Sequence, residues 1–249
     1  MSGHSKWHSI KHKKGAADAK RGKLFAVLIR QIEVAARAGG GDLDSNATLR
    51  TMVQKARDNS VPMDTIQRAI KRGTGEEEGV TYESVAYEGY APGGIAVIVQ
   101  ALTDNRNRTS AEIKNLFSRN GGSFAEPGAV SWQFERKGIV NVDKAVDEDE
   151  LMLVAADAGA DDVEDGGDAW NVTTPPTELH AVRTAIEDAG YKVASSDLTM
   201  VPTTTVEVGE ESQAKTILRL MDALEDHDDV EAVYANFDIP DAMLEAVTA

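Results

Sequence analysis

Basic side chains crowd the start of this chain in a pattern that suits the binding of phosphate groups. Residues 1–15 hold four lysines and three histidines around one tryptophan, without apolar periodicity. Lysine and arginine neutralise phosphates and release counterions, which drives binding with little sequence choice. Tryptophan and histidine rings can stack on exposed bases. We therefore predict that residues 1–15 form a basic arm that is mobile or becomes ordered on its partner.

A predicted helix over residues 16–38 continues this basic character. Lys23, Arg30 and Arg37 recur every seven residues, so they lie two helical turns apart on one side of that helix. The candidate nucleic-acid-binding residues of the arm and the helix are Lys6, Trp7, Lys11, His12, Lys13, Lys14, Lys20, Arg21, Lys23 and Arg30. The alternative is a solvated polar surface, which is where charged side chains usually lie.

Two further arginines, Arg106 and Arg108, mark a second candidate phosphate site. They follow a predicted buried strand and stand just before a helix expected over residues 109–119, which Thr109 and Glu112 would start as a capping box. A helix N-terminus presents free N–H groups and a positive dipole to anions, and arginine adds bidentate contacts. The alternative is a polar loop whose asparagine and aspartate residues build turns.

The sequence also argues against several kinds of chemistry. The chain has no cysteine, so disulfides and thiolate metal sites are excluded. His4, His8 and His12 have the spacing of one helix face, but the lysines around them would repel a metal ion. The motifs of serine hydrolases, zinc proteases and phosphate loops do not occur. Apolar runs of about six residues are much shorter than the roughly 18 that a membrane span needs. We expect a cytoplasmic protein that uses no cofactor, metal, membrane or small-molecule substrate.

The net charge of −16 conceals an uneven distribution along the chain. Residues 1–72 carry 15 lysines and arginines against 6 aspartates and glutamates, a net charge of +9. Residues 73–249 carry 11 against 36, a net charge of −25. Such asymmetry points to a polyanionic partner for the basic part. The alternative is that the basic part docks on the acidic remainder of its own chain, because opposite charges within one molecule also attract.

Hydrophobic periodicity predicts the elements that must position these residues. Three helices, over residues 16–38, 46–58 and 62–73, would make a small bundle. Further helices are expected over residues 109–119, 148–158, 178–189 and 214–224, and strands over residues 81–87, 95–99, 130–135, 139–142, 169–173, 191–198, 204–208 and 230–237. This alternation predicts an α+β, multidomain fold: an N-terminal three-helix bundle plus two ferredoxin-like α/β modules, one inserted in the other. The expected domains are residues 1–76 for the basic bundle and arm, 77–137 plus 204–249 for one module, and 138–203 for the acidic inserted module.

Several motifs, in this order, resemble the YebC family. They are residues 1–7 (MSGHSKW), 10–14 (IKHKK), 18–23 (DAKRGK), 59–62 (NSVP), 68–73 (RAIKRG), 87–90 (YEGY), 92–94 (PGG) and 103–109 (TDNRNRT). The resemblance implies a helical bundle followed by two α/β modules around a cleft. Bacterial members are described as probable DNA-binding transcriptional regulators, and mitochondrial relatives as translational activators. Some bacterial members are linked to the ribosome and to the synthesis of proline-rich stretches. The basic N-terminal residues and the Asn/Arg loop are then candidate nucleic-acid contacts.

The residues and the resemblance together lead to the hypothesis of a non-enzymatic, nucleic-acid-binding regulator of transcription or translation. Its partner would be DNA, or RNA within the ribosome, and RNA polymerase or the ribosome is the machinery it would meet. The bundle offers no helix with asparagine, glutamine and arginine concentrated for reading base edges, which favours RNA. Two alternatives stay open: a protein-interaction module with an acidic body, and an enzyme that acts in the cleft through a carboxylate and His180 or His227.

Overall fold

The computed structural model describes residues 17–248, which fall into two compact units. Within the described residues, the first unit contains residues 17–34, 79–135 and 202–248; the second contains residues 35–78 and 136–201. The predicted α+β class, with three helices ahead of the sheets, is confirmed. The predicted domain boundaries stay a prediction. Six candidate contacts lie outside the described residues: Lys6, Trp7, Lys11, His12, Lys13 and Lys14.

Three helices come first in the described chain, each within one residue of its predicted bounds. They are α2 (Ala17–Gly39), α3 (Ala47–Asp58) and α4 (Met63–Thr74). Asn46 caps α3 by accepting a hydrogen bond from the Leu49 N–H, and Gly75 ends α4 in the left-handed region, with φ of 84°. Pro62 is the N-cap of α4 and not part of its first turn, because its backbone is extended. Among residues 17–248, no helix has both the length and the apolar character to cross a membrane.

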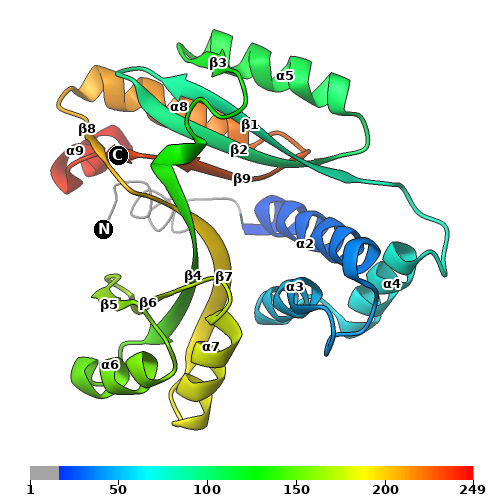
Figure 1. Cartoon of the computed structure of the whole chain (residues 1–249). Helices are drawn as coiled ribbons and strands as arrows, with labels where there is room; N and C mark the ends of the chain where they lie inside the picture. Colours follow the sequence, from blue (N-terminus) through cyan, green and yellow to red (C-terminus); the bar gives the residue numbers. More distant parts are fainter. Residues whose placement is uncertain (1–16, 249) are drawn as a thin grey trace. The chain divides into compact units, whose positions relative to one another are not determined.

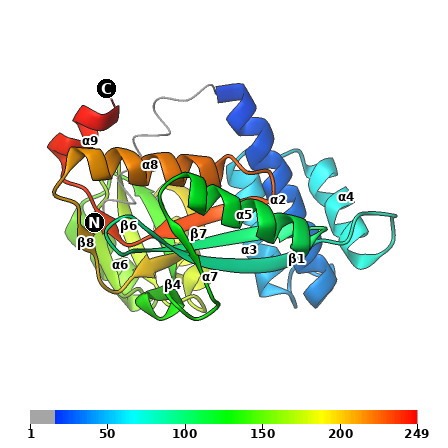
Figure 2. The ribbon, with the colours of Figure 1, turned by 90° about the horizontal axis from the view of Figure 1, so that it is seen from above.

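A four-stranded antiparallel sheet forms the centre of the first unit (Figure 1). Its strands are β1 (Glu83–Ala91), β2 (Ile95–Thr103), β3 (Ser123–Ala125) and β9 (Val230–Ala235), in the order β3-β1-β2-β9. Helices α5 (Arg106–Arg119) and α8 (Glu211–Glu225) lie side by side on one face of this sheet (Figures 1 and 2). Strand β2 is buried along almost its whole length, as its continuous apolar sequence indicates.

This sheet differs from that of a ferredoxin-like module both in its strand order and in its connections. A tight hairpin joins the central strands β1 and β2, with Gly93 and Gly94 both at positive φ. Helix α5 then carries the chain to β3 at one edge, while α8 and β9 join the sheet only after the chain returns from the second unit. The unit is completed by β8 (Val206–Glu207), which pairs with β10 (Phe237–Asp238), and by α9 (Asp241–Thr248).

A buried carboxylate organises the loop that follows β3 and contains the short 3-10 helix η1 (Ser131–Gln133). Glu88 of β1 is 7% exposed, and its carboxylate accepts three hydrogen bonds of 2.6–3.0 Å from the backbone N–H groups of Gly128, Val130 and Ser131. Burial alone would raise the pKa of Glu88, but these hydrogen bonds outweigh it and lower the pKa. The loop holds Trp132 at the surface with its side chain well exposed.

The second unit contains a sheet with the ferredoxin-like order. Its strands are β4 (Phe134–Asp143), β5 (Asp162–Asp165), β6 (Ala169–Thr174) and β7 (Val193–Pro202), in the order β5-β6-β4-β7. Helices α6 (Glu148–Asp157) and α7 (Leu179–Asp188) bury their apolar sides against it. The chain order of strand, helix, strand, strand, helix and strand is that of a ferredoxin-like module.

Helix α3 belongs to this second unit and is tied to it by ion pairs. Lys55 of α3 bonds to Asp197 of β7. Arg183 of α7 makes a bidentate pair with Asp58, at 2.7 and 3.1 Å, and also bonds to Ser196. One cation of the basic region, Lys55, therefore binds the chain's own acidic module, as the internal-docking alternative supposes.

Three strand predictions are wrong. Residues 130–135 and 139–142 are not two strands, because η1 precedes one long strand, β4. Strands β3 and β5 were not predicted; β5 has a single apolar residue, Val163, so it shows no alternation. The last predicted strand is broken at Asn236, whose fully buried side chain bonds to the backbone N–H of Ala96.

Candidate nucleic-acid interface

Helix α5 begins three residues before Thr109, the start that its sequence pattern indicates. Asn105 is the N-cap, since its side chain accepts a hydrogen bond from the Arg108 N–H, so Arg106 and Arg108 lie in the first helical turn. The predicted capping box of Thr109 and Glu112 is wrong, because asparagine is the stronger cap and comes first in the chain. Positive charge in a first turn opposes the helix dipole, so these arginines benefit from acidic partners.

Asp229 provides such a partner from the start of β9. The residue is 8% exposed, and its carboxylate accepts from the Thr109 hydroxyl at 2.6 Å and from Arg108 Nη2 at 2.8 Å. The hydroxyl oxygens of Thr103 and Thr109 lie 2.8 Å apart, and both threonines are fully buried. Asp104 holds Arg108 from a second side, at 3.0 Å. Arg108 is thus already shared between two carboxylates of its own chain.

The pKa values in this cluster favour the charged forms. Burial alone would raise the pKa of Asp229, but the Thr109 hydrogen bond and the contacts with Arg108 outweigh burial and lower it. The hydrogen bond to Asp229 is in turn the main cause that raises the pKa of Arg108. The pair is therefore ionised at neutral pH.

Two cations of α2 bind the loop between α8 and β9. We call residues 225–229 the acidic loop, because four of its five residues are aspartate or glutamate. Lys23 and Arg30 donate to backbone carbonyls of this loop; the acceptors are Glu225 and, at 2.8 Å, His227 for Lys23, and Asp228, at 2.7 Å, for Arg30. Arg30 Nη1 also lies 3.8 Å from Asp229 Oδ1. Burial lowers the pKa of Lys23, although the surrounding carboxylates act in the opposite direction.

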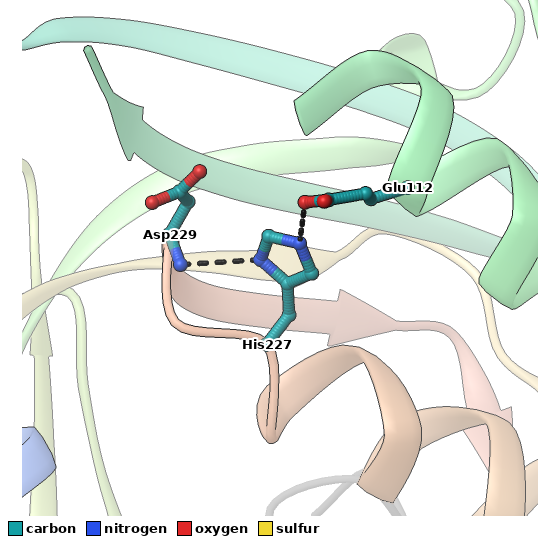
Figure 3. Close-up of side chains that lie close together, drawn as sticks. All are labelled: Glu112, His227 and Asp229. Atoms are coloured by element: carbon teal, nitrogen blue, oxygen red, sulfur yellow. Dashed lines mark hydrogen bonds and ion pairs between the residues drawn. The ribbon is translucent and has the colours of Figure 1, made fainter. Parts of the chain in front are cut away.

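Glu112, His227 and Asp229 lie close enough together to raise the question of a metal site or a catalytic dyad (Figure 3). Their potential ligand atoms are all within 4.8 Å of one another. The Asp229 N–H donates to His227 Nδ1 at 3.1 Å, so the proton sits on Nε2, which donates to Glu112 at 2.8 Å. Both ring nitrogens are occupied, which leaves none to accept a substrate proton. The Arg108 guanidinium against Asp229 would repel a metal ion.

An open hollow of about 520 Å³ lies over this cluster, lined by Arg108, Glu112, Asp226, His227, Asp228 and Asp229. Its lining carries more negative than positive charge, so it does not attract phosphate as it stands. A second, smaller hollow of about 60 Å³ lies in the second unit and includes His180 in its lining. Arg183, which also lines this hollow, already forms ion pairs with Asp58 and Glu187 and a hydrogen bond with Ser196.

Among the candidate residues that the structure describes, some are thus bound within the chain and others are exposed. It brings Lys23, Arg30 and Arg108 together around the acidic loop. Arg21 is exposed, with its guanidinium 5.5 Å from the centre of the Phe25 ring, and Arg106 is exposed without an ion pair among residues 17–248. Lys20 lies in α2.

Sequence reasoning missed Asp229, the residue on which this cluster depends. The run of polar residues at 226–229 indicates a loop, and nothing in its pattern marks the last of them as buried. Its partner Thr109 is 120 positions away in the chain.

Comparison with known proteins gives the family. The model of the TACO1/YebC protein N-terminal domain matches residues 5–76, and that of the TACO1/YebC second and third domain matches residues 82–237. This chain belongs to the TACO1/YebC family. The resemblance seen in the N-terminal motifs is therefore confirmed.

TACO1/YebC relatives match along the full length of the chain. A protein of Halothermothrix orenii is 54% identical over 100% of this chain and 99% of its own length, and one of Syntrophobacter fumaroxidans is 56% identical over 99% and 100%. Both carry the name "Probable transcriptional regulatory protein". A crystal structure of a conserved hypothetical protein from Aquifex aeolicus superposes with a TM-score of 0.84 at 46% identity, over 93% of this chain and 96% of that one.

Proposed function

We propose that this TACO1/YebC protein is a non-enzymatic regulator of gene expression that binds nucleic acid through its basic N-terminal region. The observation that carries the proposal is the charge asymmetry: net +9 over residues 1–72, in a chain of net −16. Nucleic acid is the polyanion that such a region suits best. The full-length relatives named as transcriptional regulatory proteins support a role in gene expression.

The proposed contacts are the basic residues of the N-terminal segment, with Trp7 as a stacking group, together with the exposed cations Arg21 and Arg106. We favour RNA, including RNA within the ribosome, because helices α2 to α4 do not concentrate asparagine, glutamine and arginine for reading base edges. DNA is the other polyanion that phosphate contacts would accept. The protein would work in the cytoplasm, where both are present in bacteria.

Crosslinking in living cells, followed by sequencing of the bound nucleic acid, tests this function. We expect recovered fragments to come mainly from RNA, with crosslinked peptides from the N-terminal segment. Recovery of promoter DNA would still support a regulator of gene expression, but one whose target is DNA and not RNA. Recovery of no more nucleic acid than from an untagged strain would reject the proposal.

A further inference from the structure

Three of the cations that the sequence assigned to phosphate are already bound within the first unit. Lys23, Arg30 and Arg108 come from two different helices, and all three donate to the acidic loop. The carbonyl and carboxylate oxygens that these cations bind occupy the positions that phosphate oxygens would occupy in a complex with nucleic acid.

The acidic loop is well suited to imitate a phosphate backbone. Its first residue, Glu225, is the last residue of α8, where carbonyl groups lack helical partners and the helix dipole is negative. Lys23 binds two of these carbonyls, at Glu225 and His227. Asp226 and Asp228 stand exposed beside them and also act on Lys23 through their charge.

The contacts also differ in how readily an outside anion could replace them. The Asp229–Thr109 bond is buried and holds α5 to β9. The side chain of Arg108 is 43% exposed, so its guanidinium faces solvent while bound to Asp229. A polyanion can therefore reach Arg108 without unfolding the cluster.

From this geometry we infer that the acidic loop is a built-in competitor, which holds Lys23, Arg30 and Arg108 until nucleic acid displaces it. The inference rests on the proposed function and adds its regulation. An intramolecular competitor acts at a high effective concentration, so it weakens binding to any polyanion that is too short or too sparsely charged. The loop thus sets a threshold: only a dense array of phosphates releases the three cations.

Charge-matched variants test the inference in the full-length chain. The loop variant is Asp226→Asn/Asp228→Asn/Asp229→Asn. The control variant, Glu148→Gln/Asp149→Asn/Asp157→Asn, removes three exposed carboxylates of α6, which belongs to the second unit. Both change the net charge equally. Binding of a short fluorescent single-stranded RNA is measured over a series of salt concentrations.

We expect the loop variant to bind about 5-fold or more tighter than the control, within the usual range of coupling between sites. Its salt slope should steepen by about 0.7 for each cation that moves onto phosphate. Adding Lys23→Gln, Arg30→Gln and Arg108→Gln should remove most of this gain. Asp226→Asn/Asp228→Asn keeps the Asp229–Thr109 bond, so it should show a smaller gain even if the triple variant is unstable.

Equal gains in the loop and control variants would mean that only long-range charge acts, and would overturn the inference while the proposed function stands. A gain that survives loss of all three cations, Lys23, Arg30 and Arg108, would overturn it as well. If neither the parent nor any variant binds RNA, both the proposed function and the inference are rejected.

Discussion

At the scale of single residues, Asp229 shows how a buried carboxylate is kept ionised. Its charge is met by the Thr109 hydroxyl and the Arg108 guanidinium, while its own N–H donates to His227. The residue links the first turn of α5 to the beginning of β9. Any change to it should therefore alter both the stability of the first unit and the freedom of Arg108.

Replacement of Asp229 by asparagine should lower the free energy of unfolding by about 2 kcal/mol at neutral pH, since hydrogen bonds to charged groups contribute roughly 1.5–3 kcal/mol. Because folding lowers the pKa of Asp229, its contribution is present above the unfolded value of about 3.9 and is lost as the pH falls below it. The parent should thus lose stability on acidification more steeply than Asp229→Asn.

Urea unfolding followed by circular dichroism, at neutral pH and in acid, measures both effects. Asp226→Asn is the matched control, because Asp226 is exposed in the same loop. An equal loss of unfolding free energy in the two variants would contradict the role given to Asp229.

At the scale of secondary-structure elements, Asn46 joins the end of α2 to the beginning of α3. Its side chain is buried, accepts from the Leu49 N–H at 3.0 Å, and donates to the carbonyls of Ala35 and Gly40 at 2.9 and 2.8 Å. It therefore satisfies three backbone groups at a helix–helix connection.

Replacement of Asn46 by alanine should destabilise the fold by about 2 kcal/mol, the upper end for N-cap residues, because carbonyls on α2 also lose their donor. Asp147→Ala is the control: Asp147 caps α6 at an exposed position, and within the described part of the chain its side chain accepts only from N–H groups of the first turn of α6. It should cost about 1 kcal/mol or less. Thermal unfolding compares the two, and a greater loss in Asp147→Ala would argue against this account of Asn46.

The elements that periodicity predicted well are those whose burial follows a regular pattern. Helices α2 to α4 place apolar residues at helical spacing, and β2 is a continuous apolar run. Strand β5 has one buried residue in four and follows from pairing with β6, which is not visible locally. The start of α5 was misplaced because two cap signals compete within five residues.

The candidate site was predictable only in part, for a different physical reason. Residue type identified Lys23, Arg30 and Arg108 as cations that bind oxygen acceptors, and they do so. Which acceptors they bind depends on the acidic loop, about 200 positions from Lys23 and Arg30 and about 120 from Arg108. From the sequence, either external phosphate or the chain's own acidic residues could bind these cations. In the folded chain, the acidic loop binds them.

At the scale of the whole molecule, the excess positive charge of residues 1–72 is divided between two uses. Lys23, Arg30 and Lys55 bind groups of the chain itself. Other cations of this region are exposed and make no ion pair among residues 17–248; they are Arg21, Arg37, Arg57 and Lys71. Since internal partners account for only some of the charge, the remainder is available for an external polyanion.

The salt dependence of RNA binding by an arm variant tests this account most directly. The variant is Lys6→Gln/Lys11→Gln/Lys13→Gln/Lys14→Gln, and the control is Arg119→Gln/Arg136→Gln/Lys192→Gln/Arg219→Gln, which changes the net charge equally at exposed positions of later elements. We expect the arm variant to lose about 0.7 from the slope of log affinity against log salt for each phosphate contact removed, while the control stays close to the parent. An arm variant that binds RNA with the affinity and slope of the parent would contradict the account.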